Sequence, residues 1–178
     1  LWTGTGLTEP TKTVTIVKGS IGNLAYTATW TMSGDVNGDA IYINDFSARI
    51  GANVTLDINL KNTEAVTAYV FDLVLPEGIT VAKNDKDKYI DALSDRHVDH
   101  TRTFNYKGNN TYSLSTLSVN SEELAGNDGA IRILTLAIAD NLPVGTYAVD
   151  IKNASYSTPT GKMVKLPDTA ASITVEDY

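Results

Sequence analysis

The segment 53–60, which reads NVTLDINL, alternates polar and apolar residues at every position. A β-strand points successive side chains to opposite faces, so a period of two predicts a strand with one buried and one exposed face. Segments 146–151 (TYAVDI) and 172–176 (SITVE) follow the same period. The pattern restricts the chain to half-buried strands, because an amphipathic helix needs apolar residues three or four positions apart.

Three further segments predict strands of other kinds. Segments 65–75 (AVTAYVFDLVL) and 130–139 (AIRILTLAIA) are apolar at almost every position. Continuous apolar runs of this kind predict central strands that are covered on both faces. Segment 111–119 (TYSLSTLSV) changes its alternation between Leu114 and Leu117, which predicts a β-bulge at that point.

Turn signals separate the predicted strands at short intervals. Gly, Pro, Asn and Asp gather in the segments 75–78, 106–110, 125–129, 141–145 and 158–162. Strands spaced by about 8 to 15 residues, with no long helical period between them, favour a sandwich over alternating strands and helices. We therefore predict an all-β protein built as a β-sandwich.

Charge and cysteine content exclude several classes of function. The 14 Lys and Arg residues face 21 Asp and Glu residues, which gives a net charge of −7. Nucleic acids and anionic membranes require a basic surface, so we expect neither as a partner. The absence of cysteine excludes disulfides, thiolate metal sites and a cysteine nucleophile. No apolar run approaches the roughly 20 residues that span a bilayer, and the missing initiator Met leads us to expect part of a longer protein.

A polar, Gly-rich stretch at residues 32–40 predicts a boundary between two modules. Before this stretch, residues 12–31 read as a compact, hairpin-like pair of strands. The long series of predicted strands follows it. We therefore expect a β-hairpin appendage over residues 1–33 and a β-sandwich over residues 34–178.

The boundary overlaps a stretch that begins like a calcium loop, residues 34–46 (GDVNGDAIYINDF). Asp35, Asn37 and Asp39 stand at alternate positions, and Asp45 follows them. Calcium is bound by six to eight oxygen ligands, and loops of the dockerin and EF-hand kind supply them in this order. These four residues are therefore the candidate ligands of a calcium site.

Two features count against calcium at this position. The twelfth residue from Asp35 is Phe46, where such a loop closes with an acidic group, and Ala40 stands where the loop needs a glycine. We favour a turn in which Asp and Asn cap their own backbone, acting as a hinge between the modules. The following residues then form the first strand of the sandwich, with Ile41 and Ile43 inward.

Residues 94–100 (SDRHVDH) hold the densest group of metal-capable side chains in the sequence. On a strand, His97 and His100 would lie on opposite faces, whereas a zinc site needs three or four convergent ligands. We favour a structural loop in which Arg96 binds neighbouring carbonyls or Asp95, with a metal site as the alternative.

Aromatic side chains offer a second candidate site, because sugar rings stack on planar side chains. Tyr89, Tyr106 and Tyr112 are the candidate ligand-binding residues of such a carbohydrate platform. The alternative is that these rings pack in the core or across strands, as most strand aromatics do.

Catalysis is not expected from this sequence. Glycoside hydrolysis needs two carboxylates that flank one bond, and a Ser–His–Asp triad needs a nucleophile elbow, which is missing. The candidate catalytic glutamates all lie in predicted turns, beside ordinary solvated charges, and no pair of them stands out. They are Glu64, Glu77, Glu122 and Glu123.

Residues 1–30 resemble the C-terminal half of the Listeria–Bacteroides repeat of bacterial surface proteins. The resemblance is carried by the Trp-x-Gly-x-Gly start at Trp2, the TVTI strand, the KGSIGN turn and the closing YTATW. It implies a spacer or adhesive module without a catalytic role.

Residues 40–177 resemble a cohesin-like module. Residues 52–81 match its opening strands up to a Pro-Glu-Gly exit, and residues 126–157 match its later half, from Gly-Ala through a strand to the GTY that starts the next. The resemblance implies a jelly-roll-like antiparallel sandwich of about nine strands, a fold shared with several cellulose-binding modules.

Together, the two resemblances imply a secreted or surface-attached fragment of a bacterial protein of the Bacteroidetes or Firmicutes type. We expect a non-enzymatic, extracellular binding or scaffolding module with a protein partner. A carbohydrate-binding module and a structural stalk or adhesin domain are the alternatives.

Overall fold

The computed structural model describes residues 2–4, 26–28 and 38–177. The chain divides into two compact units, Leu1–Ser33 and Gly34–Tyr178. No helix in the described part of the chain is long and apolar enough to cross a membrane.

The first unit contains one described pair of strands. Strand β1 (Trp2–Gly4) pairs antiparallel with β2 (Tyr26–Ala28), with Trp2 opposite Ala28. The TVTI strand and the KGSIGN turn expected between them lie outside the described residues.

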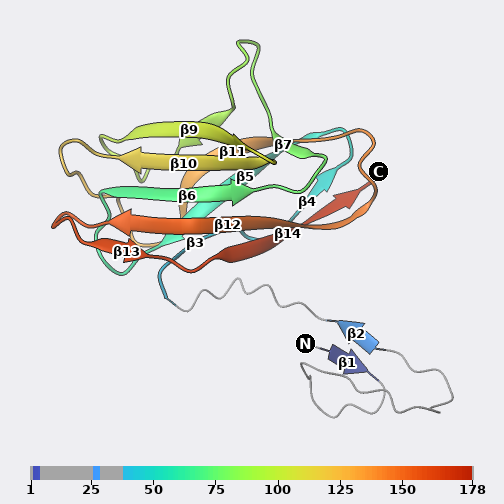
Figure 1. Cartoon of the computed structure of the whole chain (residues 1–178), viewed down its shortest axis with the longest axis horizontal. Coiled ribbons are helices and arrows are strands. Elements are labelled where there is room, and N and C mark those ends of the chain that lie inside the picture. Colours follow the sequence, from blue (N-terminus) through green and yellow to red (C-terminus); the bar gives the residue numbers. More distant parts are fainter. Residues whose placement is uncertain (1, 5–25, 29–37, 178) are drawn as a thin grey trace. The chain divides into compact units, whose positions relative to one another are not determined.

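The second unit is a sandwich of two sheets (Figure 1). The seven-stranded sheet lies in front in Figure 1 and has the order β4 (Phe46–Arg49), β14 (Thr169–Glu176), β12 (Gly145–Ser157), β6 (Ala68–Val74), β10 (Thr111–Leu117) and β9 (Thr101–Gly108), with β13 (Met163–Lys165) beside β12. The five-stranded sheet behind it has the order β3 (Ala40–Tyr42), β5 (Asn53–Lys61), β11 (Ala130–Ile138) and β7 (Ile79–Val81), with β8 (Asp91–Leu93) also on β11.

The predicted all-β sandwich is confirmed, with two differences of detail. One pair, β4 with β14, is parallel, at the point where the chain has left the five-stranded sheet after β3 and entered the seven-stranded sheet at Phe46. Twelve strands, β3 to β14, lie within residues 38–177, compared with about nine expected. Part of the excess arises because a projecting loop separates β7 from β8, which both pair with β11.

The core lies between the two sheets and follows the alternation of the sequence. On β5, Leu56 and Ile58 are buried, whereas Thr55 and Asp57 are exposed. Phe71 on β6 packs in the same core from the other sheet. Each fully buried side chain of this size contributes about 1.5–3 kcal/mol relative to an exposed one, so the alternating strands hold the sheets together.

The predicted bulge between Leu114 and Leu117 is wrong. Thr116 keeps the inward position, and Leu117 is 48% exposed, so alternation continues to the end of β10. Thr116 faces inward because its hydroxyl accepts a hydrogen bond from the Arg132 guanidinium at 3.1 Å. The irregular pairing of β10 with β9 lies at the other end of the strand.

The apolar run 65–75 does form a central strand, but β6 is not covered on both faces. Its outward-facing Val70 is 38% exposed, because no layer formed by residues 38–177 covers that face of the seven-stranded sheet. The run 130–139 forms β11, the centre of the other sheet, and its charged residue Arg132 is 0% exposed.

Candidate functional site

The candidate calcium stretch is described only in its second half. Asp35 and Asn37 lie outside the described residues. Asp39 accepts hydrogen bonds from the Thr63 amide at 2.9 Å, from the Thr63 hydroxyl at 3.1 Å and from the Tyr156 hydroxyl. Burial, together with the hydrogen bond to Asp39, raises the pKa of Tyr156. Asp39 therefore fastens the start of the sandwich to two distant segments.

Asp45 serves a separate contact, since its Oδ1 accepts a hydrogen bond from the Ser172 amide at 2.8 Å. Ile41 and Ile43 are buried, as predicted, but the strand expected over residues 40–46 ends at Tyr42, and Phe46 begins β4 in the other sheet. Among the described residues, no group of three or more His, Asp or Glu side chains is placed to hold a metal ion. Calcium binding by the four candidate ligands stays a prediction.

Arg96 ties the loop 94–100 to the sheets, as expected for a structural loop. The side chain is 7% exposed. Its guanidinium donates five hydrogen bonds of 2.7–3.0 Å to the carbonyls of Leu60, Ala125, Gly126 and Gly129 and to the side chain of Asn62. Charge-assisted bonds of this kind are stronger than neutral ones, so Arg96 organises the turns around it.

His97 and His100 meet, although a strand would have separated them. Their ring centroids are 5.1 Å apart and the rings are perpendicular, at 89°. His97 Nε2 lies 3.1 Å from the Tyr69 hydroxyl, and burial lowers the pKa of His97 to about 4. Both ring nitrogens of His100 are buried without a hydrogen-bond partner in the described part of the chain. Burial therefore lowers the pKa of both histidines and favours their uncharged forms.

Tyr89, Tyr106 and Tyr112 come together, but not as a flat platform. They line a common hollow of about 510 Å³. Tyr112 is 3% exposed and Tyr106 is 52% exposed. The ring of Tyr112 makes angles of 83° with Tyr89 and 48° with Tyr106. Tyr112 therefore belongs mainly to the core, and ligand binding by this group stays a prediction.

A buried ion pair, which sequence reasoning missed, lies within the five-stranded sheet, and its arginine also bonds to the seven-stranded sheet. Arg132 on β11 contacts Asp91 on β8 through two hydrogen bonds of 2.8 and 2.5 Å. It also donates to the backbone carbonyls of Thr103 on β9 and Ser115 on β10. The available signal was a single arginine inside the apolar run 130–139.

The outer face of the seven-stranded sheet carries a row of small and apolar side chains. In the strand register, Leu117, Ala68, Ser157 and Met163 stand opposite one another across β10, β6, β12 and β13. Directly opposed residues share a face of the sheet, so this row lies on the solvent side. Val70 stands in the next row, between Ser115 and Ser155. We call Val70, Leu117 and Met163, which are 38%, 48% and 67% exposed, the apolar patch.

A polar cluster lies beside the apolar patch on the same sheet. Asp72 Oδ2 accepts hydrogen bonds from Lys107 Nζ at 2.9 Å and from Asn153 Nδ2 at 2.8 Å. Burial alone would raise the pKa of Asp72, but the hydrogen bonds from Asn153 and Lys107 outweigh burial and lower it. The face therefore combines an apolar centre with a fixed, charged neighbour.

Several solved structures with a similar fold are cohesins. No protein-family model and no curated protein matches the sequence. A non-cellulosomal cohesin from Archaeoglobus fulgidus matches with a TM-score of 0.63 and 13% identity, over 79% of this chain and 92% of the cohesin. The seventh ScaB type I cohesin from Pseudobacteroides cellulosolvens matches with a TM-score of 0.63 and 17% identity, over 79% and 94%.

A chain from a type I cohesin–dockerin complex of Clostridium thermocellum matches with a TM-score of 0.67 and 12% identity. The match covers 79% of this chain and 100% of the matched chain. Identities this low carry information about the fold alone. The second unit of the chain has a cohesin-like, jelly-roll-like β-sandwich fold.

Proposed function

We propose that the sandwich is a non-catalytic binding and scaffolding module that takes a protein partner on the outer face of its seven-stranded sheet. The apolar patch is the observation that carries this proposal. Protein interfaces use a few apolar anchors within a polar rim, and Val70, Leu117 and Met163 lie among serines and threonines. Single exposed apolar residues need no explanation, but three of them gathered in two adjacent rows of one sheet face favour a binding face.

The comparisons support the same class of function. Several of the similar structures are complexes of a cohesin with a dockerin. By analogy, the partner of this chain is a second folded protein rather than a small molecule. The diverging planes of the three tyrosines give less support to a carbohydrate platform.

The setting of the module is part of the proposal. We infer an extracellular or cell-surface location in a bacterium, from the resemblance of residues 1–30 to a surface repeat and from the cohesin-like fold. Residues 1–33 then act as a spacer module before the sandwich, and residues 34–37 as part of the hinge between them.

Capture experiments with the full chain test the partner and the face together. The immobilised chain is exposed to the culture supernatant of its source organism, with and without EDTA, and bound proteins are identified by mass spectrometry. Binding of the captured protein to purified variants is then measured by calorimetry. EDTA sensitivity is expected only if calcium on either partner supports the contact.

The double variant Val70→Asp/Leu117→Asp should weaken binding at least about a hundredfold, because two charges would be buried against apolar groups. Val144→Asp is the matched control, since Val144 is 60% exposed but lies in the turn before β12, outside the apolar patch. Equal binding by the double variant and the control would rule out the proposed face.

A further inference from the structure

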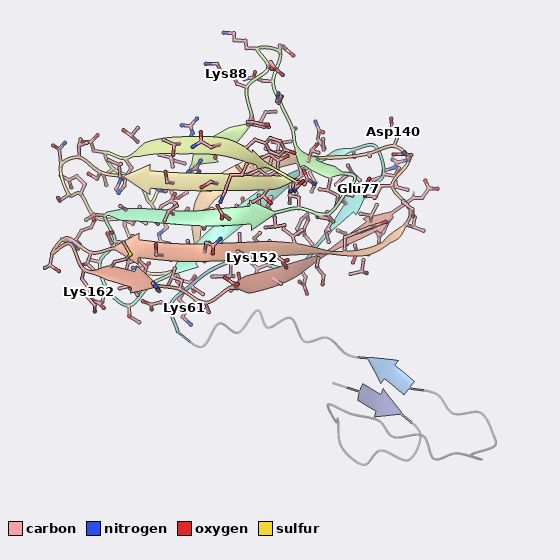
Figure 2. All side chains as sticks on the ribbon, in the orientation of Figure 1. Lys61, Glu77, Lys88, Asp140, Lys152 and Lys162 are labelled. Atoms are coloured by element: carbon pink, nitrogen blue, oxygen red, sulfur yellow. The ribbon has the colours of Figure 1, made fainter. Side chains whose placement is uncertain are left out.

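The two sheets leave a slot where β8 and β9 run as edge strands. In the described residues, β8 pairs only with β11, and β9 pairs only with β10. A hollow of about 700 Å³ lies between them, beside the projecting loop that carries Lys88 (Figure 2). Tyr89, Asp91, Arg102 and Phe104 contribute to its lining.

Two guanidinium groups share a single carboxylate in the wall of this hollow. Arg132 bonds to both oxygens of Asp91, at 2.8 and 2.5 Å, and Arg102 Nε lies 3.0 Å from Asp91 Oδ2. The side chains of Arg132 and Asp91 are 0% and 4% exposed, so water screens them weakly. The group of three carries one uncompensated positive charge, in a chain whose net charge is −7.

Arg102 brings that excess charge to the surface. Its side chain is 47% exposed. The bond from Nε to Asp91 fixes the orientation of the guanidinium, while Nη1 and Nη2 make no hydrogen bond within the described residues. The free edge of a guanidinium is a two-donor fork that matches the two oxygens of a carboxylate.

The rest of the lining indicates what carries the carboxylate. The rings of Tyr89 and Phe104 are 4.8 Å apart and form an apolar wall. A phosphate or sulfate ion has no apolar part to place against such a wall, whereas a carboxylate on a carbon skeleton does. Lys88 adds a second cation at the rim, and the other acid of the lining, Asp87, is already paired with Lys83 at 2.9 Å.

We propose that this hollow binds the carboxylate of an acidic ligand, with the free edge of Arg102 on its two oxygens and its carbon skeleton against Tyr89 and Phe104. The site lies between the sheet edges, and Thr101 of its lining stands opposite Leu117 of the apolar patch. The proposed contacts, Arg102, Tyr89 and Phe104, are not part of the apolar patch, so the proposal does not depend on the partner face. An acidic side chain and a uronic acid sugar both supply this chemistry.

Nuclear magnetic resonance titrations of the full chain test the site with matched probes. N-acetylglutamate amide and methyl glucuronide supply the two kinds of carboxylate, and N-acetylglutamine amide and methyl glucoside are their neutral controls. At least one acidic probe should shift the Arg102 Nε–Hε signal with a Kd of about 1–10 mM, as expected for a small ligand held by one ionic fork. The neutral probes should not shift it.

Variants separate the fork from general charge. Arg102→Gln should weaken binding, read from Tyr89 signals, by at least about tenfold, and Arg102→Lys should give an intermediate Kd because it keeps the charge but loses the fork. Lys152→Gln removes an exposed positive charge on β12, outside the hollow, and should leave the Kd unchanged (Figure 2).

Each result is decisive. A shift with one acidic probe alone supports the site and identifies the source of the carboxylate. Equal shifts with neutral probes, no shift with either acidic probe, or an unchanged Kd in Arg102→Gln would overturn the proposal. Should Arg102→Gln fail to fold, Arg102→Lys carries the comparison, because it can keep the ion pair with Asp91.

Discussion

At the scale of single residues, Arg132 illustrates how a strand can carry a charge into the core. Its guanidinium reaches Asp91 and polar groups on two strands of the opposite sheet. Each of these hydrogen bonds pairs a donor of the guanidinium with an acceptor that also needs a partner. The charge of Arg132 is therefore buried together with its partners. The arrangement depends on two residues 41 positions apart, which no local pattern connects.

Removing only one member of this pair should be costly. Asp91→Ala leaves the Arg132 charge buried and uncompensated, so the free energy of unfolding should fall by about 3–5 kcal/mol in urea titrations. The double variant Asp91→Leu/Arg132→Met should recover most of the loss, because it removes both charges. Asp87→Ala, at an exposed ion pair with Lys83, is the control and should change the midpoint little. A single variant as stable as the double variant would contradict this account.

At the scale of elements, the loop 94–100 connects neighbouring turns and strands at one end of the sandwich. Arg96 holds it to the turn 125–129 and to β5, and the rings of His97 and His100 contact each other edge to face. Because burial removes water from both histidines, their uncharged forms are favoured and their pKa values are lowered.

Stability should therefore fall as the pH drops from about 6.5 to 4. The pKa of His97 is about 4 in the folded chain and 6.5 in the unfolded chain, so the unfolded chain binds more protons in this window. The stabilisation is complete above pH 6.5 and is lost towards pH 4, by about 1–3 kcal/mol. The acids Asp99 and Glu122 face His100 and moderate the loss.

Urea titrations at pH 7, 6 and 5 measure this dependence. The variant His97→Gln/His100→Gln should show a flatter profile over the same range, since glutamine does not titrate. If the variant and the natural chain lose stability in parallel between pH 7 and 5, carboxylates rather than these histidines set the dependence.

The sequence predicts elements well where one physical cause dominates. Segment 53–60 predicts β5 because one buried face imposes a period of two. The sequence does not show in the same way which side chains of β10 face inward. Thr116 faces inward because of its hydrogen bond with Arg132 from the opposite sheet. Likewise, His97 and His100 meet because their segment turns, whereas a parity argument assumes an extended strand.

The candidate sites were less accessible to sequence reasoning. Tyr89, Tyr106 and Tyr112 line one hollow, but the burial of Tyr112 depends on its packing against neighbouring rings, which include Phe104. The partners of Asp39 lie 24 and 117 residues away, so its contacts could not be derived from a loop pattern. The apolar patch appears only when the register of four strands is known.

At the scale of the whole module, the two sheets differ in what they offer to a partner. The outer face of the five-stranded sheet is polar along β5, where Asn53, Thr55 and Asp57 are exposed. The outer face of the seven-stranded sheet presents the apolar patch beside the Asp72 cluster. Because of this asymmetry, we propose the seven-stranded sheet as the partner face.

The most direct test of that claim is to follow methyl resonances while the captured partner is added to the full chain. When one equivalent of the partner has been added, the methyl signals of Val70, Leu117 and Met163 should shift or broaden, because these side chains become buried at the interface. The signal of Val144, in the turn before β12, should stay unchanged. Changes at Val144 with none at the apolar patch would contradict the claim that the partner binds the outer face of the seven-stranded sheet.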